Sequence, residues 1–154
     1  MMRAGEPAWM TKLHEAFEAA LLAAGDAVRG VDFSISEEYR EPPADLAPPD
    51  GAALGWTCRI ADGVVVEFSR APQPDVDCCI ELDYSVFAEL AALVIEGDAD
   101  KQKSMEQRQV VAINNGSLIV TGDLGNVPSC LANVHDAMAR LTDAQIPEDR
   151  SPAV

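Results

Sequence analysis

Apolar residues recur every four positions near the start of the chain and at alternate positions soon after it. The first pattern runs through Trp9, Leu13, Phe17 and Leu21. It gathers apolar side chains on one face and predicts a helix over residues 8–25. The second pattern, over residues 31–36, alternates apolar with polar residues and predicts a half-buried strand. The proline-rich stretch 42–51 predicts a loop, because proline lacks the N–H group that a strand interior needs.

Residues 54–68 predict a β-hairpin with Asp62-Gly63 near its tip. One arm carries alternate apolar residues at Leu54, Trp56, Cys58 and Ile60, and the other carries them at Val64, Val66 and Phe68. A two-residue loop would pair Ile60 with Val65 and put these two sets on opposite faces. A three-residue loop over 61–63 would pair Ile60 with Val64 and put them on one face. We therefore expect a type I turn with Gly63 left-handed in a G1 bulge.

The next part of the chain predicts one strand and two helices. Alternation from Val76 to Leu82 is typical of a half-buried strand. The helix predicted over 86–95 is interrupted only by Glu89, so it needs burial on more than one side. A more polar helix, capped by Asp98 or Asp100, is expected to follow.

The last part predicts a strand, a helix and an overall α+β class. Residues 117–121 are apolar on both faces, which suggests an interior strand. The final helix is expected to begin near Asn126, with an apolar stripe at Leu131, Val134, Met138 and Leu141. We expect one domain over 8–142, a flexible N-terminus over 1–7 and a flexible tail over 143–154.

Three stretches resemble the sterol carrier protein 2-like family. They are the hairpin 56–68, the Asp-rich segment 74–77 leading into strand and apolar helix, and residues 116–124, which look like the family's Gly-x-Leu-x-Val-x-Gly-Asp strand. The resemblance covers about residues 31–142. The final helix departs from it, because residues 124–128 precede that helix where the family runs straight into it.

The resemblance implies a five-stranded, mostly antiparallel sheet covered by helices, with an apolar tunnel between sheet and helices. Such a tunnel would take a fatty acid, an acyl-CoA, a sterol or a similar lipid. Binding would gain about 0.8 kcal/mol for each methylene group buried. The candidate ligand-binding residues are Trp56, Phe68, Phe87, Leu90, Leu93, Val94, Met105, Leu131, Val134 and Met138.

The net charge of the chain narrows the classes of partner that we expect. Eleven basic residues stand against 26 acidic ones, and the net charge is −15. A nucleic-acid binder needs basic residues against the phosphates, so nucleic acid is not expected, and anionic membrane surfaces are disfavoured for the same reason. Apolar runs are too short to span a bilayer, and the first residues lack a signal peptide's apolar stretch. We expect a cytoplasmic protein that is not integral to a membrane.

Candidate chemistry is sparse. The two histidines, His14 and His135, have no second ligand at metal-binding spacing, so we expect no metal site. His135 and Asp136 could form an acid–base pair, although adjacent helical residues diverge. The cysteines are expected to be buried, reduced thiols: Cys58, Cys78, Cys79 and Cys130. No catalytic or cofactor motif is present.

Three functions therefore stand side by side. The first is non-catalytic binding or transfer of a hydrophobic ligand. The second is an acidic interaction module or accessory subunit with a dry core. The third is a small α+β isomerase or hydrolase, which requires a pocket that holds His135 or a buried carboxylate. The ligand, and the choice between a homodimer and a partner enzyme, stay open.

Overall fold

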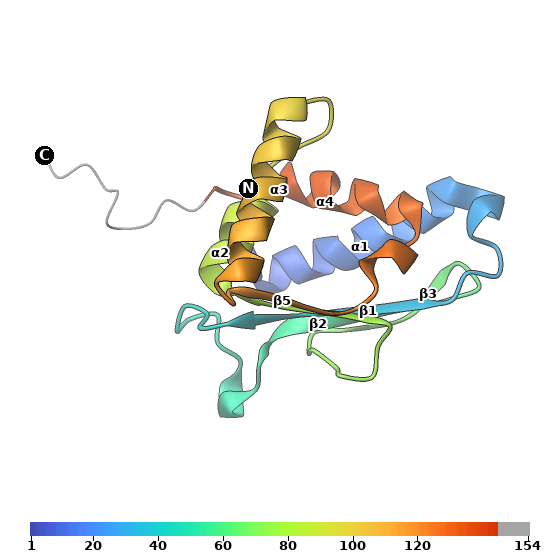
Figure 1. Ribbon diagram of the computed structural model, residues 1–154. Coiled ribbons are helices and arrows are strands. Elements are labelled where there is room, and N and C mark those ends of the chain that lie inside the picture. Colours follow the sequence, from blue (N-terminus) through green and yellow to red (C-terminus); the bar gives the residue numbers. More distant parts are fainter. Residues whose placement is uncertain (145–154) are drawn as a thin grey trace, which may run out of the picture.

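The computed structural model describes residues 1–144, in which four α-helices lie on one face of a five-stranded sheet (Figure 1). The strands are β1 (Phe33–Arg40), β2 (Leu54–Ala61), β3 (Val64–Ser69), β4 (Cys78–Asp83) and β5 (Leu118–Gly122). The helices are α1 (Pro7–Ala24), α2 (Tyr84–Ala91), α3 (Ala99–Asn114) and α4 (Ala132–Ala139). Short 3₁₀ turns lie at Gly25–Val28, Pro49–Gly51, Leu124–Asn126 and Ser129–Leu131.

The sheet has the strand order β3-β2-β1-β4-β5. Only β1 and β4 pair in parallel, and the other three neighbouring pairs are antiparallel. The predicted α+β class with a mostly antiparallel, five-stranded sheet is therefore confirmed. No helix within residues 1–144 is long and apolar enough to cross a membrane.

The hairpin turn differs from the predicted one. Ala61 pairs with Val64, so the loop has two residues, and both Asp62 (φ 49°) and Gly63 (φ 72°) are left-handed. This is the geometry of a type I′ turn, whose twist matches that of the flanking strands. The predicted three-residue loop with a G1 bulge is wrong.

A bulge inside β3 brings apolar residues of both arms to one face of the hairpin, which the longer loop was expected to do. Arg59 pairs with Glu67 and Ile60 with Val65, so Val66 is an extra residue in β3. The bulge brings Phe68 back to the core side, opposite Cys58. Val64 and Val66 are left exposed, at 61% and 63%.

Two predicted helices have different bounds in the structure. The apolar helix predicted over 86–95 ends at Ala91, because side chains of α4 bind the backbone that follows. Ile95 N donates to Asp136 Oδ1 at 2.8 Å, and His135 Nε2 lies 2.8 Å from Leu93 O. The last helix begins at Ala132, after two 3₁₀ turns, and not near Asn126.

The strand predicted to be interior lies at the edge of the sheet. β5 pairs with β4 alone, and its Ile119 is 43% exposed. Leu118 and Val120 point to the helix side, where α3 contacts the strand. Apolar residues on both faces therefore marked an exposed edge here and not a central position.

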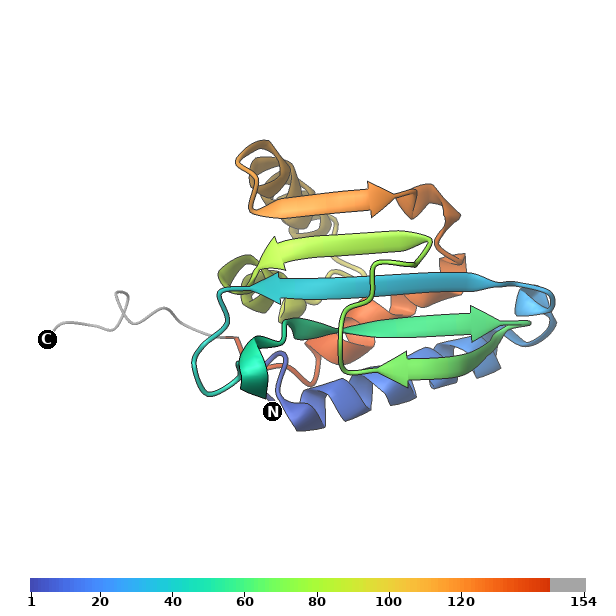
Figure 2. The same cartoon turned by 90° about the horizontal axis from the view of Figure 1, so that it is seen from below.

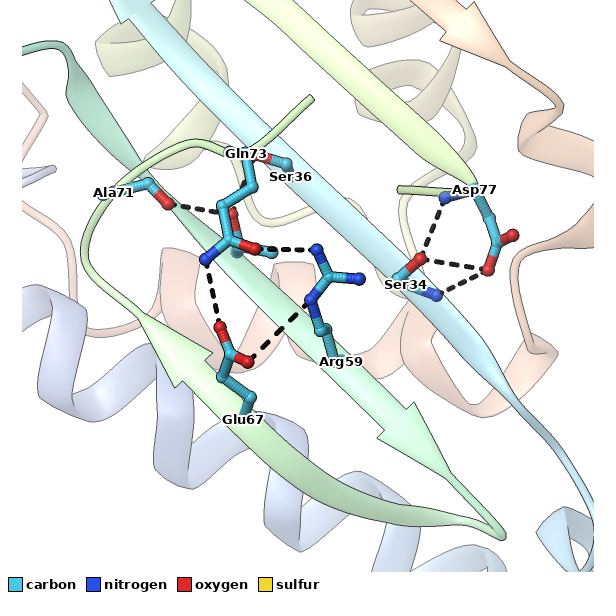
Figure 3. A network of polar contacts seen from close by, with 8 residues as sticks. Ser34, Ser36, Arg59, Glu67, Ala71, Gln73 and Asp77 are labelled. Atoms are coloured by element: carbon cyan, nitrogen blue, oxygen red, sulfur yellow. Dashed lines mark hydrogen bonds and ion pairs between the residues drawn. The ribbon is translucent and has the colours of Figure 1, made fainter. Parts of the chain in front are cut away.

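The open face of the sheet is crossed by the segment that joins β3 to β4 (Figure 2). Polar groups hold this segment down (Figure 3): Thr57 Oγ1 donates to Ala71 O at 2.8 Å, and Gln73 N donates to Ser36 Oγ at 3.0 Å. Both hydroxyl-bearing residues are fully buried. At the start of β4, Ser34 N donates to Asp77 Oδ2 at 2.8 Å. The crossing lets β4 lie parallel to β1 while all helices stay on the other face.

The N-terminal residues make defined contacts with the domain. Met2 N donates to Leu141 O at 2.8 Å, and Tyr84 Oη donates to the carbonyl of the fully buried Ala4 at 2.7 Å. Met2 and Ala4 therefore contact the domain that was expected to begin at residue 8. Of the tail expected over 143–154, residues 145–154 lie outside the described part of the chain.

Replacing Gly63 by alanine should destabilise the fold by more than a positive φ alone would. A Cβ there would lie 2.6 Å from Val28 O, whereas a Cβ on Gly116 (φ 81°) would meet nothing within 4 Å. We expect Gly116→Ala to cost about 1 kcal/mol and Gly63→Ala to cost about 2–3 kcal/mol. Urea unfolding of both variants measures the difference, and equal losses would contradict the packing argument.

Candidate functional site

A cavity of about 330 Å³ lies between the sheet and the helices. Its floor is formed by inward side chains of four strands: Ile35, Glu37, Trp56, Ile80, Leu82, Leu118 and Val120. Residues of α1, α2, α3, α4 and the turns before α4 form its walls and roof. Nearly all the lining is aliphatic or aromatic. A cavity of this size is at the lower end of the range of small-molecule sites in proteins.

Most of the candidate ligand-binding residues line this cavity. They are Trp56, Phe87, Leu90, Met105, Leu131, Val134 and Met138. The sheet and three helices bring them together, and α1 adds Trp9, Leu13 and Phe17, which the sequence analysis named only as the apolar face of the first helix. Their part in binding a ligand remains a prediction.

Three candidate residues lie elsewhere. Leu93 and Val94 follow the end of α2 and do not line the cavity. Phe68 lies farther along the sheet, where His14 of α1 stacks on its ring at a centroid distance of 4.7 Å. The helical pattern continued past residue 91 in sequence, but the backbone bonds to α4 ended the helix there.

The cavity opens between α3 and the segment after β5. Ile113 and Leu124 line it and are nevertheless 52% and 49% exposed, so solvent reaches it beside them. Leu124 begins the residues that depart from the family pattern. Those residues form 3₁₀ turns, and they place an apolar side chain at the mouth.

Glu37 is the feature of the cavity that the sequence analysis missed. It lies in the middle of β1, opposite Trp56 on β2 and beside Ile80 on β4. Tyr39 Oη donates to Glu37 Oε1 at 2.6 Å, and Trp56 Nε1 donates to Tyr39 Oη at 2.7 Å. No Lys or Arg side chain is among the described residues that line the cavity.

The surroundings of Glu37 favour its neutral form. Burial raises the pKa of its carboxyl, and the neighbouring donor groups of Tyr39 and Trp56 oppose this only in part. Glu37 is enclosed by protein but keeps some accessible surface, because it faces the cavity. The Tyr39 ring stacks on Phe87 at a centroid distance of 3.6 Å, which holds its hydroxyl in place. Burial and the negative Glu37 also raise the pKa of Tyr39.

A signal for Glu37 was present in the sequence. The alternation of Phe33 and Ile35 continues to Tyr39 at the same spacing, and all three are buried on the helix side. Glu37 interrupts this apolar series at an inward position. The prediction ended the strand at residue 36 and so did not reach it.

The remaining candidate residues for chemistry are His135, the cysteines and possible metal ligands. His135 lines the cavity, although its Nε2 is engaged with Leu93 O. The cysteines of the described residues are free, and burial raises the pKa of Cys58 to about 12 and also raises the pKa values of Cys78 and Cys79. A raised thiol pKa makes a poor nucleophile. No group of three metal-ligating side chains occurs among residues 1–144.

Replacing Glu37 by glutamine should make the protein less sensitive to alkaline pH. Because the folded-state pKa of Glu37 is raised above 4.5, the folded state keeps this proton to higher pH than the unfolded state does. The contribution of Glu37 to the free energy of unfolding is fully present below its pKa in the unfolded chain. It is lost as pH rises through its pKa in the folded protein. Each pKa unit of elevation corresponds to about 1.4 kcal/mol.

Urea unfolding between about pH 5 and pH 8 measures this effect. Relative to the wild type, we expect Glu37→Gln to gain stability as pH rises. Glu38→Gln removes an equal charge from the neighbouring residue on the opposite face of β1 and controls for net charge. The same pH dependence in both variants would contradict the assignment.

No family model and no curated protein matches this sequence. Solved structures similar to the chain include three that carry the name of the family it resembles. A crystal structure of sterol carrier protein 2 has a TM-score of 0.49 at 16% identity, covering 90% of this chain and 94% of that one. Domain 2 of the Helicoverpa armigera sterol carrier protein has a TM-score of 0.47 at 15% identity, covering 96% and 98%. Sterol carrier protein 2 from Yarrowia lipolytica has a TM-score of 0.35 at 16% identity, covering 89% and 85%.

Proposed function

We propose that this domain binds a hydrophobic small molecule in the cavity between its sheet and its helices. The observation that carries the proposal is the cavity itself, about 330 Å³ in volume, apolar in nearly all its lining and open beside Leu124. Protein interiors are ordinarily close-packed, with few voids larger than a water molecule. An unfilled cavity of this size forgoes packing energy, and an apolar ligand would recover it.

The proposed role is binding or transfer, without a chemical step. Each methylene group that enters the cavity gains about 0.8 kcal/mol. A fatty acid, an acyl-CoA, a sterol or a similar lipid is the proposed ligand class at this stage. Met105 and Met138 support a range of ligand shapes, because the flexible thioether adapts to its neighbours.

A dry interaction module is less well supported. That function called for a fully packed interior, and the cavity does not fit it. The acidic surface remains compatible with a protein partner, because binding in the cavity leaves the open sheet face free.

A second candidate is acid–base catalysis on a ligand held in the cavity. The wall contains both a buried carboxyl, Glu37, and an imidazole, His135, as an isomerase of this kind would need. A medium-chain ketone incubated with the protein in D₂O tests this function. Deuterium uptake at the α-carbon that Glu37→Gln abolishes and Glu38→Gln retains would support catalysis. Uptake equal to that without protein would overturn it.

Filling the cavity should block binding. Val120→Phe places a ring in the cavity from β5, whereas Ile119→Phe places the same ring on the outer face of the same strand. We expect Val120→Phe to lower the affinity for an apolar fluorescent probe about tenfold or more, because the added ring occupies the space that the probe would fill. Ile119→Phe should bind the probe as the wild type does.

Probe titration and native mass spectrometry of the purified protein measure these outcomes. Thermal unfolding checks that both variants fold, and Val120→Phe should not lose stability because its ring enters empty space. A wild-type protein that binds no apolar probe and carries no lipid would overturn the proposed function.

A further inference from the structure

The cavity carries a polar group whose chemistry can select the head group of a ligand. Glu37 is the acidic residue of its lining, and it points from the centre of the sheet into an apolar space. The other polar side chains of the lining, Gln109 and His135, come from α3 and α4 on the helix side. The sheet side therefore offers a ligand one carboxyl group and no cation.

The hydrogen-bond chain determines which oxygen of Glu37 is available. An indole N–H can only donate, so Trp56 Nε1 gives its single proton to Tyr39 Oη at 2.7 Å. Tyr39 must then send its own single proton to Glu37 Oε1, 2.6 Å away. Oε1 is thereby an acceptor, and a proton on the carboxyl resides on Oε2. Oε2 is the atom left for an occupant of the cavity, as a donor when protonated and as an acceptor when ionised.

Counting donors and charges narrows the class of head group. A carboxylate ligand would place a second acid beside Glu37 in an apolar space where no Lys or Arg is among the described lining residues, so one of the two acids would have to stay protonated. An alkylammonium ligand would bring a positive charge and three N–H donors to a carboxyl whose surroundings favour the neutral form and which offers Oε2 alone, and a buried donor without a partner costs about 1–3 kcal/mol. A hydroxyl group is neutral and can either donate to Oε2 or accept from it.

The volume limits the apolar part of the ligand. At about 30 Å³ for each water-sized group, 330 Å³ holds about eleven such groups. A methylene group is close to this size, so a chain of about ten carbons fills the cavity. A larger ligand would have to extend through the mouth beside Ile113 and Leu124.

We propose that the cavity selects neutral, hydroxyl-bearing lipids of about ten carbons, with the hydroxyl bound to Glu37 Oε2, and discriminates against fatty acids and alkylamines. This inference rests on the proposed function, since it names the ligand class of the same cavity. Glu37 acts as the specificity-determining residue, and Tyr39 and Trp56 position it.

Three ligands with one chain length test the selection. 1-Decanol, decanoate and decylamine are compared at about pH 7.5 by displacement of an apolar fluorescent probe from the wild-type protein. We expect decanol to bind about tenfold more tightly than either charged ligand, the size of one well-placed hydrogen bond. Equal affinities, or tighter binding of decanoate, would overturn the proposal, and tighter binding of decylamine would overturn it in favour of a cation site.

Variants at one position then link the selection to Glu37. Glu37→Gln keeps an acceptor for Tyr39, cannot ionise and offers an N–H donor in place of Oε2, so decanoate should gain about tenfold and decanol should change little. Glu37→Leu should lose the preference for decanol. Glu38→Gln, on the other face of β1, should retain the wild-type order of affinities.

The outcomes separate this inference from the function on which it rests. Failure of all three ligands and the probe to bind overturns the proposed function, whereas binding without head-group preference overturns only the selection. An unchanged preference in folded Glu37→Gln also overturns the role of Glu37. Should Glu37→Leu not fold, as judged by circular dichroism, the wild-type series and Glu37→Gln still decide the matter.

Discussion

The parallel pairing of β1 with β4 is the constraint on which the rest of the structure depends. It places β1 in the centre of the sheet, between β2 and β4, so its inward side chains form the middle of the floor. Parallel neighbours need a crossover connection. Here the segment between β3 and β4 supplies it on the open face, where Thr57 and Ser36 bind its backbone. All four helices are thereby free to cover the opposite face, with a cavity beneath them.

This arrangement makes the central strand the place where one polar residue has the largest effect. Glu37 sits where its neighbours in the alternation are apolar, and burial there is costly for a carboxylate. The bonds from Tyr39 and Trp56 orient the group without supplying a positive charge. Local features that lower stability are retained most often at functional sites. A cavity and a buried acid at the same point of the fold are two such features, and they support one proposed site.

The helices over the sheet are positioned by contacts that involve several residues of the cavity lining. Asp136 and His135 of α4 bind the backbone after α2, which ends that helix and directs residues 93–95 along α4. Aromatic contacts bring Phe87 onto Tyr39 and Trp9 onto Phe87 at one end of the cavity. Ile113 and Leu124, which precede and follow β5, line the cavity and are exposed to solvent.

Local periodicity determined the order of helices and strands and the α+β class, because a side chain's face follows from spacing within its own element. Most of the apolar lining was predicted only when the family resemblance was added to this pattern. The tertiary structure decided the rest. The bulge at Val66 corrected the register, since burial of Phe68 outweighed the regular ladder. β5 became an edge, because no further strand was available to pair with it. The chemical character of the cavity also depended on tertiary contacts: burial in the folded chain raises the pKa of Glu37, and the hydrogen-bond chain through Tyr39 and Trp56 orients its carboxyl.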